Sequence, residues 1–228
     1  MNKQFRWMAA ALGTCLVLSS CGGGGDGSPW MSVGADGATS IQAAALTATL
    51  STLPLEEIQP AESVSLTYMR EEEKLAHDVY AQLDQLWGAS VRVFGNIASS
   101  EATHTEAIRL LLQRYTLTDP AANAAEAVFQ NADLQQLYAR LLAQGSVSMI
   151  EALKVGAAIE EIDMFDIQAD LPAIDNQDIA LVYQNLLKGS RNHLRAFVSA
   201  LSAQGINYVP QYMSLQDYQT IIDGPMER

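Results

Sequence analysis

Residues 93–115 have the sequence VFGNIASSEATHTEAIRLLLQRY, and this stretch decides the fold. Its apolar residues recur every three or four positions, which predicts an amphipathic helix that buries one face. The expected buried stripe consists of Val93, Phe94, Ile97, Ile108, Leu111, Leu112 and Tyr115. Glu101 and His104 interrupt this stripe on the same face. The helix is therefore expected to direct a carboxylate and an imidazole into the protein interior, where an unpaired charge costs several kcal/mol.

Three further segments show the same periodicity, and the alternation typical of strands is almost absent. We therefore predict an all-α protein. One helix is expected at roughly residues 65–87, another from Ser148 and a last one from near Asn176. Ser148 and Glu151 have the spacing of a capping box, which supports a helix start at that point.

The connection between Asp119 and Gly145 is long enough to cross the length of a bundle, and it holds a smaller amphipathic helix. The expected buried face of that helix consists of Leu134, Leu137, Tyr138, Leu141 and Leu142. The pattern predicts a four-helix bundle over residues 63–205, with one long crossover that contains a short extra helix. Residues 206–228 carry aromatic residues without a clear period and are expected to pack over one end of the bundle.

The first 20 residues have the features of an export signal. Lys3 and Arg6 precede an apolar run at residues 7–18, which is too short to span a bilayer core of about 30 Å. Leu18-Ser19-Ser20-Cys21 resembles the lipobox of bacterial lipoproteins. That resemblance implies cleavage after residue 20, acylation of Cys21 and a lipid anchor at the membrane surface of the bacterial cell envelope. An ordinary secretory signal with a chance cysteine is the alternative.

Residues 21–62 are rich in Gly, Ala, Ser and Thr and show no sustained periodicity. Such a segment buries too little apolar surface to order itself, so we predict a flexible tether between the lipid and the bundle. The one exception to this flexibility is a weak helix at residues 41–53.

The chain has 13 Lys and Arg against 26 Asp and Glu, a net charge of −13. Its basic residues are scattered singly, which argues against a nucleic-acid partner, because phosphate binding needs clustered basic residues. Both cysteines lie within the first 21 residues. A cysteine-based zinc site or an iron–sulfur cluster in the bundle is therefore excluded.

Acidic and imidazole side chains also interrupt the other helical stripes. Glu72 and Glu73 lie on the shoulders of the first stripe, and Glu160 lies in the third, with Asp163 one turn further on. His193 lies within the fourth stripe. One such polar residue would be weak evidence, but their recurrence on every helix favours a metal site. A hydrogen-bonded network in a metal-free bundle is the alternative.

Three motifs resemble those of the ferritin-like superfamily, including rubrerythrin-type proteins. They are Glu73-x-x-Ala76-x-x-x-Tyr80, Phe94-x-x-Ile97-Ala98-x-x-Glu101-x-x-His104 and Ala157-x-x-Glu160-x-x-Asp163. More narrowly, residues 69–76 and 189–194 resemble an uncharacterised prokaryotic ferritin-like family known only as a domain of unknown function. The resemblance implies the bundle and a metal site, but no established activity.

The fourth helix departs from the ferritin-like pattern, which carries a second Glu-x-x-His there. This chain has Ser190-x-x-His193. Either Asp163 replaces the missing carboxylate from the third helix, or Ser190 leaves an open coordination position. Glu72 could be a ligand of the first helix in place of Glu73, or a hydrogen-bond acceptor for an imidazole. Glu161 follows Glu160 on its helix and is expected to turn away from the stripe.

The expected ligand set is Glu73, Glu101, His104, Glu160, Asp163 and His193, with Glu72 in reserve. Four carboxylates would balance two divalent cations, and mixed oxygen and nitrogen ligation suits iron first, then manganese or zinc. The resemblance therefore implies a protein with two iron ions that reacts with oxygen or peroxide, or oxidises ferrous ion, with a redox partner in the envelope. The alternative is a non-enzymatic metal-binding or scaffold lipoprotein.

Overall fold

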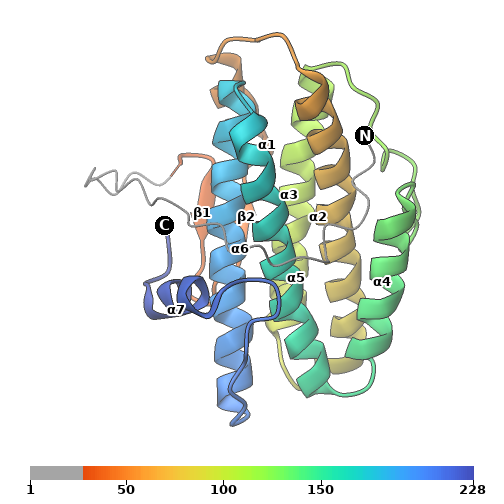
Figure 1. Ribbon diagram of the computed structural model, residues 1–228, viewed down its shortest axis with the longest axis vertical. Helices are drawn as coiled ribbons and strands as arrows, with labels where there is room; N and C mark the ends of the chain where they lie inside the picture. Colours follow the sequence, from red (N-terminus) through yellow and green to blue (C-terminus); the bar gives the residue numbers. More distant parts are fainter. Residues whose placement is uncertain (1–27) are drawn as a thin grey trace.

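The structure is a computed structural model that describes residues 28–228. In this part of the chain there are seven α-helices, a short 3₁₀ turn at Leu171–Ala173 and one two-stranded hairpin (Figure 1). The prediction of a helical bundle is confirmed, and the small hairpin is an addition to it. The expected signal peptide at residues 1–20 and the expected lipidated Cys21 lie outside the described residues.

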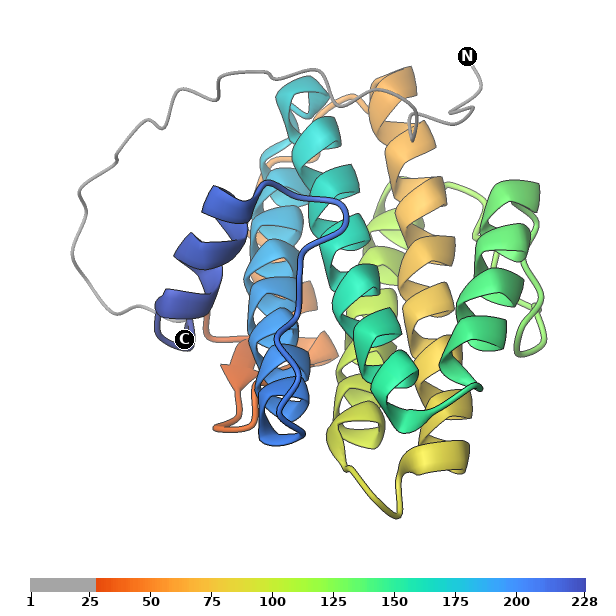
Figure 2. The ribbon, with the colours of Figure 1, turned by 60° about the horizontal axis from the view of Figure 1, so that its bottom comes forward.

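Four long helices form the bundle: α2 (Pro60–Trp87), α3 (Val93–Arg114), α5 (Met149–Asp170) and α6 (Gln177–Ala203). Figures 1 and 2 show them side by side along most of their lengths. Short connections join α2 to α3 and α5 to α6, so each of these pairs is antiparallel. Helix α2 begins earlier than the apolar pattern predicted, because Pro60 occupies its first turn and Gln59 and Glu62 form a reciprocal capping box.

Aromatic rings pack in the core toward the end of the bundle where α3 begins. The ring of Phe197 lies 5.1 Å from that of Tyr80 and 5.7 Å from that of Phe94, measured between centroids. Gly156 faces Phe197 from α5, and a Cβ atom there would lie only 2.4 Å from the Phe197 ring. Glycine at this position therefore allows α5 and α6 to approach closely around a large side chain.

The long crossover contains α4 (Ala132–Gly145), which packs on the outside of α2 and α5 (Figure 2). Its first turn is capped by Asn131, whose side chain accepts from the backbone of the residues that follow. The carboxylate of Glu71 on α2 accepts a hydrogen bond from the Asn131 backbone N–H at 2.9 Å. The predicted extra helix is thus present, and its start is fastened to the bundle by a buried acidic side chain.

Residues 28–59 differ from the predicted flexible tether. Strands β1 (Met31–Val33) and β2 (Thr39–Ile41) form an antiparallel hairpin, and α1 (Ala43–Ser51) follows. The segment contributes the buried side chains Trp30, Ile41, Leu46 and Leu50. These few apolar residues are too sparse to form a core of their own, but the bundle supplies the surface on which they are buried.

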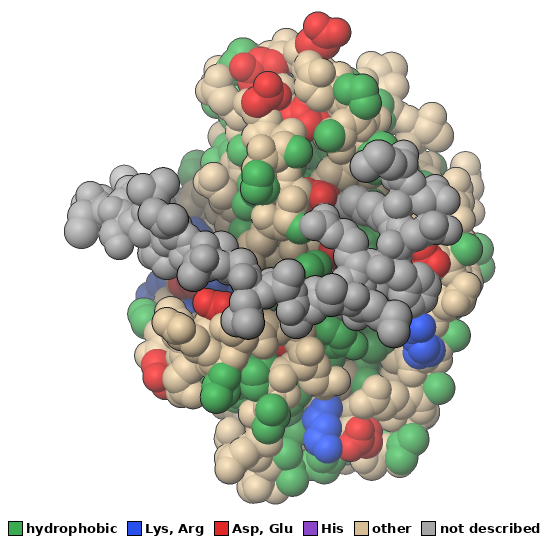
Figure 3. Space-filling view, in the orientation of Figure 1, with side chains coloured by type: hydrophobic (Ala, Val, Ile, Leu, Met, Phe, Trp, Pro, Cys, Tyr) green, Lys and Arg blue, Asp and Glu red, His purple; other side chains and the backbone are tan. Residues whose placement is uncertain are grey.

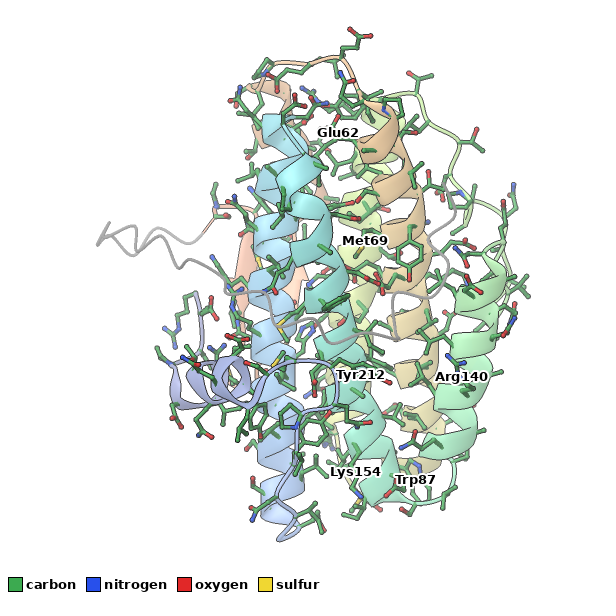
Figure 4. All side chains as sticks on the ribbon, viewed as in Figure 1. Glu62, Met69, Trp87, Arg140, Lys154 and Tyr212 are labelled. Carbon is green, nitrogen blue, oxygen red and sulfur yellow. The ribbon has the colours of Figure 1, made fainter. Side chains whose placement is uncertain are left out.

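The C-terminal segment covers the side of the bundle and not its end. Helix α7 (Leu215–Asp223) lies across α6, and the residues before it cross α5, where Tyr212 is labelled in Figure 4. Glu161 of α5 is fully buried beneath this segment and accepts hydrogen bonds, at 2.6–3.1 Å, from the Tyr208 hydroxyl and three successive backbone N–H groups. Glu161 thus turns away from the stripe that contains Glu160, as predicted, and the C-terminal segment buries the face on which it lies.

The surface reflects the acidic composition. Figure 3 shows acidic side chains grouped at the top of this face, at the end of the bundle where α2 begins. Within residues 28–228, no helix combines the length and the apolar character needed to cross a membrane.

Candidate metal centre

Glu101 lies at the middle of a buried cluster inside the bundle. Its Oε2 atom lies 2.9 Å from Nδ1 of His104, one turn further along α3, and its Oε1 atom lies 2.8 Å from Nδ1 of His193 on α6. The two imidazole rings are stacked, with centroids 5.2 Å apart and planes inclined by 19°. One carboxylate therefore faces two imidazoles, one with each oxygen.

A second carboxylate flanks each imidazole. Oε2 of Glu73 on α2 lies 3.5 Å from Nδ1 of His104, and Oε2 of Glu160 on α5 lies 3.5 Å from Nδ1 of His193. All four bundle helices contribute, and every one of these side chains is at least 97% buried. Figure 4 labels Met69, one turn before Glu73, near the middle of α2, so the cluster lies deep between the ends of the bundle.

Several of these buried atoms lack hydrogen-bond partners among the described residues. They are Nδ1 of His104, Nδ1 of His193, Oε1 of Glu73 and Oδ1 of Asp163. The imidazole nitrogens approach carboxylate oxygens at ion-pair distance, but without the alignment of a hydrogen bond. Each unsatisfied buried polar group costs about 1–3 kcal/mol, so their convergence on one region needs a compensating partner. A divalent cation with oxygen and nitrogen ligands fits this set of atoms.

The electrostatics of the cluster also favour a cation. Burial lowers the pKa of His193, but the charges of Glu101 and Glu160 outweigh it and raise that pKa to about 9. Burial raises the pKa of Glu73 to about 8, although His104 opposes the shift. Burial also acts to raise the pKa of Glu101, but the nearby His104 and His193 outweigh burial and lower that pKa. Without a cation the cluster therefore holds protons on atoms that a metal ion would need, and metal binding must displace them.

Asp163 and Ser190, the two alternatives for the missing fourth-helix carboxylate, lie in direct contact. The Ser190 hydroxyl donates a hydrogen bond to Oδ2 of Asp163, and both side chains are buried. Burial raises the pKa of Asp163 well above its ordinary value, and the nearby Glu73 adds to the shift. The serine thus occupies the position of the expected ligand on α6 and holds in place a carboxyl group that comes from α5.

The carboxyl groups of the expected ligand set share one small cavity. Its lining includes Glu72, Glu73, Glu101, Glu160 and Asp163, together with apolar residues of α2, α4 and α5. The structure therefore brings together all the acidic residues that were expected as ligands, with Glu72 beside Glu73 at the cavity wall. His77, the third histidine, lies apart from the cluster and pairs with Asp78 at 2.9 Å.

Two hydroxyl groups support the cluster from outside. Tyr80 donates a hydrogen bond of 2.6 Å to Oε1 of Glu160. Thr39 of the hairpin has its Oγ1 atom 2.8 Å from Nε2 of His104 and 3.1 Å from Nε2 of His193. The sequence analysis named Tyr80 only as part of a ferritin-like motif. It did not identify Thr39, since a single threonine in a segment rich in small residues carries no signal of its own.

Comparison with known proteins places the chain in a family. Residues 62–225 match the family described as "Uncharacterized protein domain (DUF2202)", and the match includes every acidic and imidazole residue of the cluster. The chain belongs to this family. The DUF2202 match begins after the hairpin, so Thr39 lies outside it.

An archaeal relative extends the comparison. The chain is 46% identical over 179 residues to the uncharacterized protein MJ0754 of Methanocaldococcus jannaschii. The aligned region covers 78% of this chain and 96% of the relative. The crystal structure of the hypothetical protein MJ0754 superposes with a TM-score of 0.74 at 46% identity, over 77% of this chain and 99% of that one. The DUF2202 bundle is therefore shared with a solved structure.

Proposed function

We propose that this DUF2202 protein binds two divalent metal ions inside its bundle and is a member of the ferritin-like superfamily. What carries the proposal is the convergence of imidazole Nδ1 atoms and carboxylate oxygens that lack hydrogen-bond partners in a fully buried region. Glu73 and His104 would hold one ion, and Glu160 and His193 the other. Glu101 would bridge them, because each of its oxygens faces one imidazole.

The proposed metal is iron, with manganese and zinc as the next choices. Carboxylate and imidazole ligands suit these ions, and the cluster contains no thiolate. Asp163 supplies the fourth carboxylate, so that four negative charges balance two divalent cations. A pair of ferrous ions bound there would supply electrons to oxygen or peroxide, which would be reduced as the iron is oxidised.

The surrounding residues would hold these ligands and exclude water. Tyr80 fixes one oxygen of Glu160, which leaves Oε2 directed toward His193. Ser190 fixes one oxygen of Asp163, which leaves Oδ1 without a partner. Such outer partners hold ligands in position and typically matter for affinity.

The alternative is a metal-binding or scaffold protein without catalytic turnover. Its support is the near-complete burial of Glu101, His104 and His193, which leaves little room for a substrate larger than a small molecule.

The main proposal also includes an export signal, a lipid anchor at Cys21, a place at the bacterial cell envelope and a redox partner there. These last parts rest on the sequence of residues 3–21 alone.

Metal analysis of the full-length protein, purified from its own host without chelating resin, tests the proposal. We expect about two metal ions per chain, and loss of metal in His193→Ala. His77→Ala is the matched control, because His77 lies outside the cluster and its side chain is partly exposed. Wild-type protein without metal, and with a thermal midpoint unchanged by added ferrous ion, would contradict the proposal.

A further inference from the structure

The hairpin places one hydroxyl group between the two imidazoles of the metal centre. Oγ1 of Thr39 lies within hydrogen-bond distance of Nε2 on both His104 and His193, at 2.8 and 3.1 Å. We propose that Thr39 is a positioning residue that accepts a hydrogen bond from both Nε2–H groups and thereby makes Nδ1 of each ring the metal-binding atom. This inference rests on the proposed metal centre, and it adds the N-terminal hairpin to that centre.

Hydrogen-bond accounting supports this role. A neutral imidazole carries one N–H, so a proton on Nε2 leaves the lone pair on Nδ1. A hydroxyl oxygen has two lone pairs and can accept from two donors at once. In both rings the remaining nitrogen, Nδ1, faces Glu101 and a flanking carboxylate. One threonine therefore sets the same orientation for two ligands on different helices.

The hairpin is fastened to the two helices that carry these histidines. The backbone N–H of Thr39 donates to Oγ of Ser100 at 2.8 Å, and that of Ile41 donates to Oγ1 of Thr103 at 3.0 Å. Both acceptors lie on α3. At the hairpin turn, Gly37 has a φ of +87°, and a Cβ atom there would lie 2.7 Å from the backbone oxygen of Asn192 on α6. The turn can approach α6 this closely because Gly37 has no side chain.

A small residue of α6 borders the same Nε2 edge of the His104 ring. A Cβ atom at Gly189 of α6 would lie 2.7 Å from Cε1 and 2.9 Å from Nε2 of His104, and 3.6 Å from Oγ1 of Thr39. The ring therefore rests against the backbone of α6, with its Nε2 edge toward the threonine. Space on α6 and a hydroxyl group on β2 together define one ring orientation.

Three variants of the full-length chain test the role of Thr39. Thr39→Val keeps the shape and removes the hydroxyl, Thr39→Ser restores the hydroxyl, and Ser40→Ala is the control, because successive strand residues point to opposite faces. Zn²⁺ is the probe, with affinity measured by competition against a chelator. Thr39→Val should weaken Zn²⁺ binding by about 10- to 100-fold, the range typical for loss of an outer hydrogen-bond partner. Thr39→Ser and Ser40→Ala should stay close to wild type.

Nitrogen-15 NMR of the Zn²⁺-loaded protein gives a second readout, which does not depend on the measured Zn²⁺ affinity. In wild type, both histidines should show a protonated, slowly exchanging Nε2 and a metal-bound Nδ1. In Thr39→Val these Nε2 protons should exchange faster, and Thr39→Ser should restore slow exchange. Equal Zn²⁺ affinity of Thr39→Val and wild type, or Zn²⁺ bound through Nε2, would overturn the assignment of Thr39. Wild-type protein that binds no Zn²⁺ would instead overturn the metal centre itself.

Discussion

Exchange of carboxylate for amide should have different effects at Asp163 and at Glu101 when the protein is stripped of metal. Burial raises the pKa of Asp163 well above its ordinary value, which favours the neutral form of this side chain. Asparagine has nearly the same shape, and its oxygen can still accept the hydrogen bond from Ser190. Asp163→Asn should therefore change the free energy of unfolding of the metal-free protein by no more than about 1 kcal/mol, the size of one ordinary hydrogen bond.

Glu101 is ionised and lies between two imidazoles. Burial acts to raise its pKa, but the two rings outweigh burial and lower it, so Glu101→Gln removes a charge that both rings need. Loss of one partner from a buried ion pair costs about 3–5 kcal/mol. At about 2–4 °C of thermal midpoint per kcal/mol for a domain of this size, the midpoint should fall by about 6–20 °C.

Thermal unfolding followed by circular dichroism, at pH 7 with excess chelator, measures this difference. After anaerobic loading with ferrous ion, Glu101→Gln should lose both metal ions and Asp163→Asn one, although Asp163→Asn is as stable as wild type without metal. The reasoning is refuted if Asp163→Asn lowers the midpoint of the chelated protein as much as Glu101→Gln does. Asp163 would then be charged and structurally paired in the absence of metal.

Three other changes test separate parts of the molecule. Gly156→Ala should destabilise the protein by about 1–3 kcal/mol in urea unfolding, because its Cβ atom would overlap the Phe197 ring; an unchanged midpoint would mean that α5 and α6 separate freely. Burial opposes the shift, but hydrogen bonds from His77, Lys74 and a backbone amide lower the pKa of Asp78, so Asp78→Asn should cost about 1.5–3 kcal/mol at pH 7. A lowered pKa stabilises the fold above the unfolded value of about 3.9, so this difference should shrink as the pH falls below that value in unfolding curves from pH 7 to 3. Cys21→Ser should leave the bundle folded and release the protein from membranes, and sedimentation with membranes after a high-salt wash would contradict the lipid anchor.

The bundle and most of the cluster could be predicted from the sequence, because both depend on local periodicity. Glu101 and His104 stand out within an apolar stripe at a spacing of one helical turn, and His193 does so on the last helix. When four amphipathic helices bury their stripes against each other, polar residues at inward positions must meet. Glu160 and Glu73 follow the same rule, and the structure brings them within 3.5 Å of the imidazoles.

The residues that sequence reasoning missed depend on contacts between distant segments. Thr39 lies 65 residues from His104, in a stretch whose composition is typical of a linker. Its segment buries Trp30 and a few other apolar residues against a surface that exists only after the bundle has formed. Glu161 likewise becomes buried only because the C-terminal segment folds back over α5. Helical periodicity describes the face of each helix and gives no information about which distant segment covers it.

The order in which the chain is synthesised has a consequence for how the metal enters. Thr39 and His193 are 154 residues apart, so the hairpin leaves the ribosome long before its seat on α6 has been made. The first part of the described chain to emerge therefore cannot take its place until α6 has been made. Until it does, the Nε2 edges of both imidazoles remain uncovered and the rings free to turn. Metal ions are expected to load most easily during that interval. Docking of the hairpin then covers the imidazoles and holds the ions in the bundle.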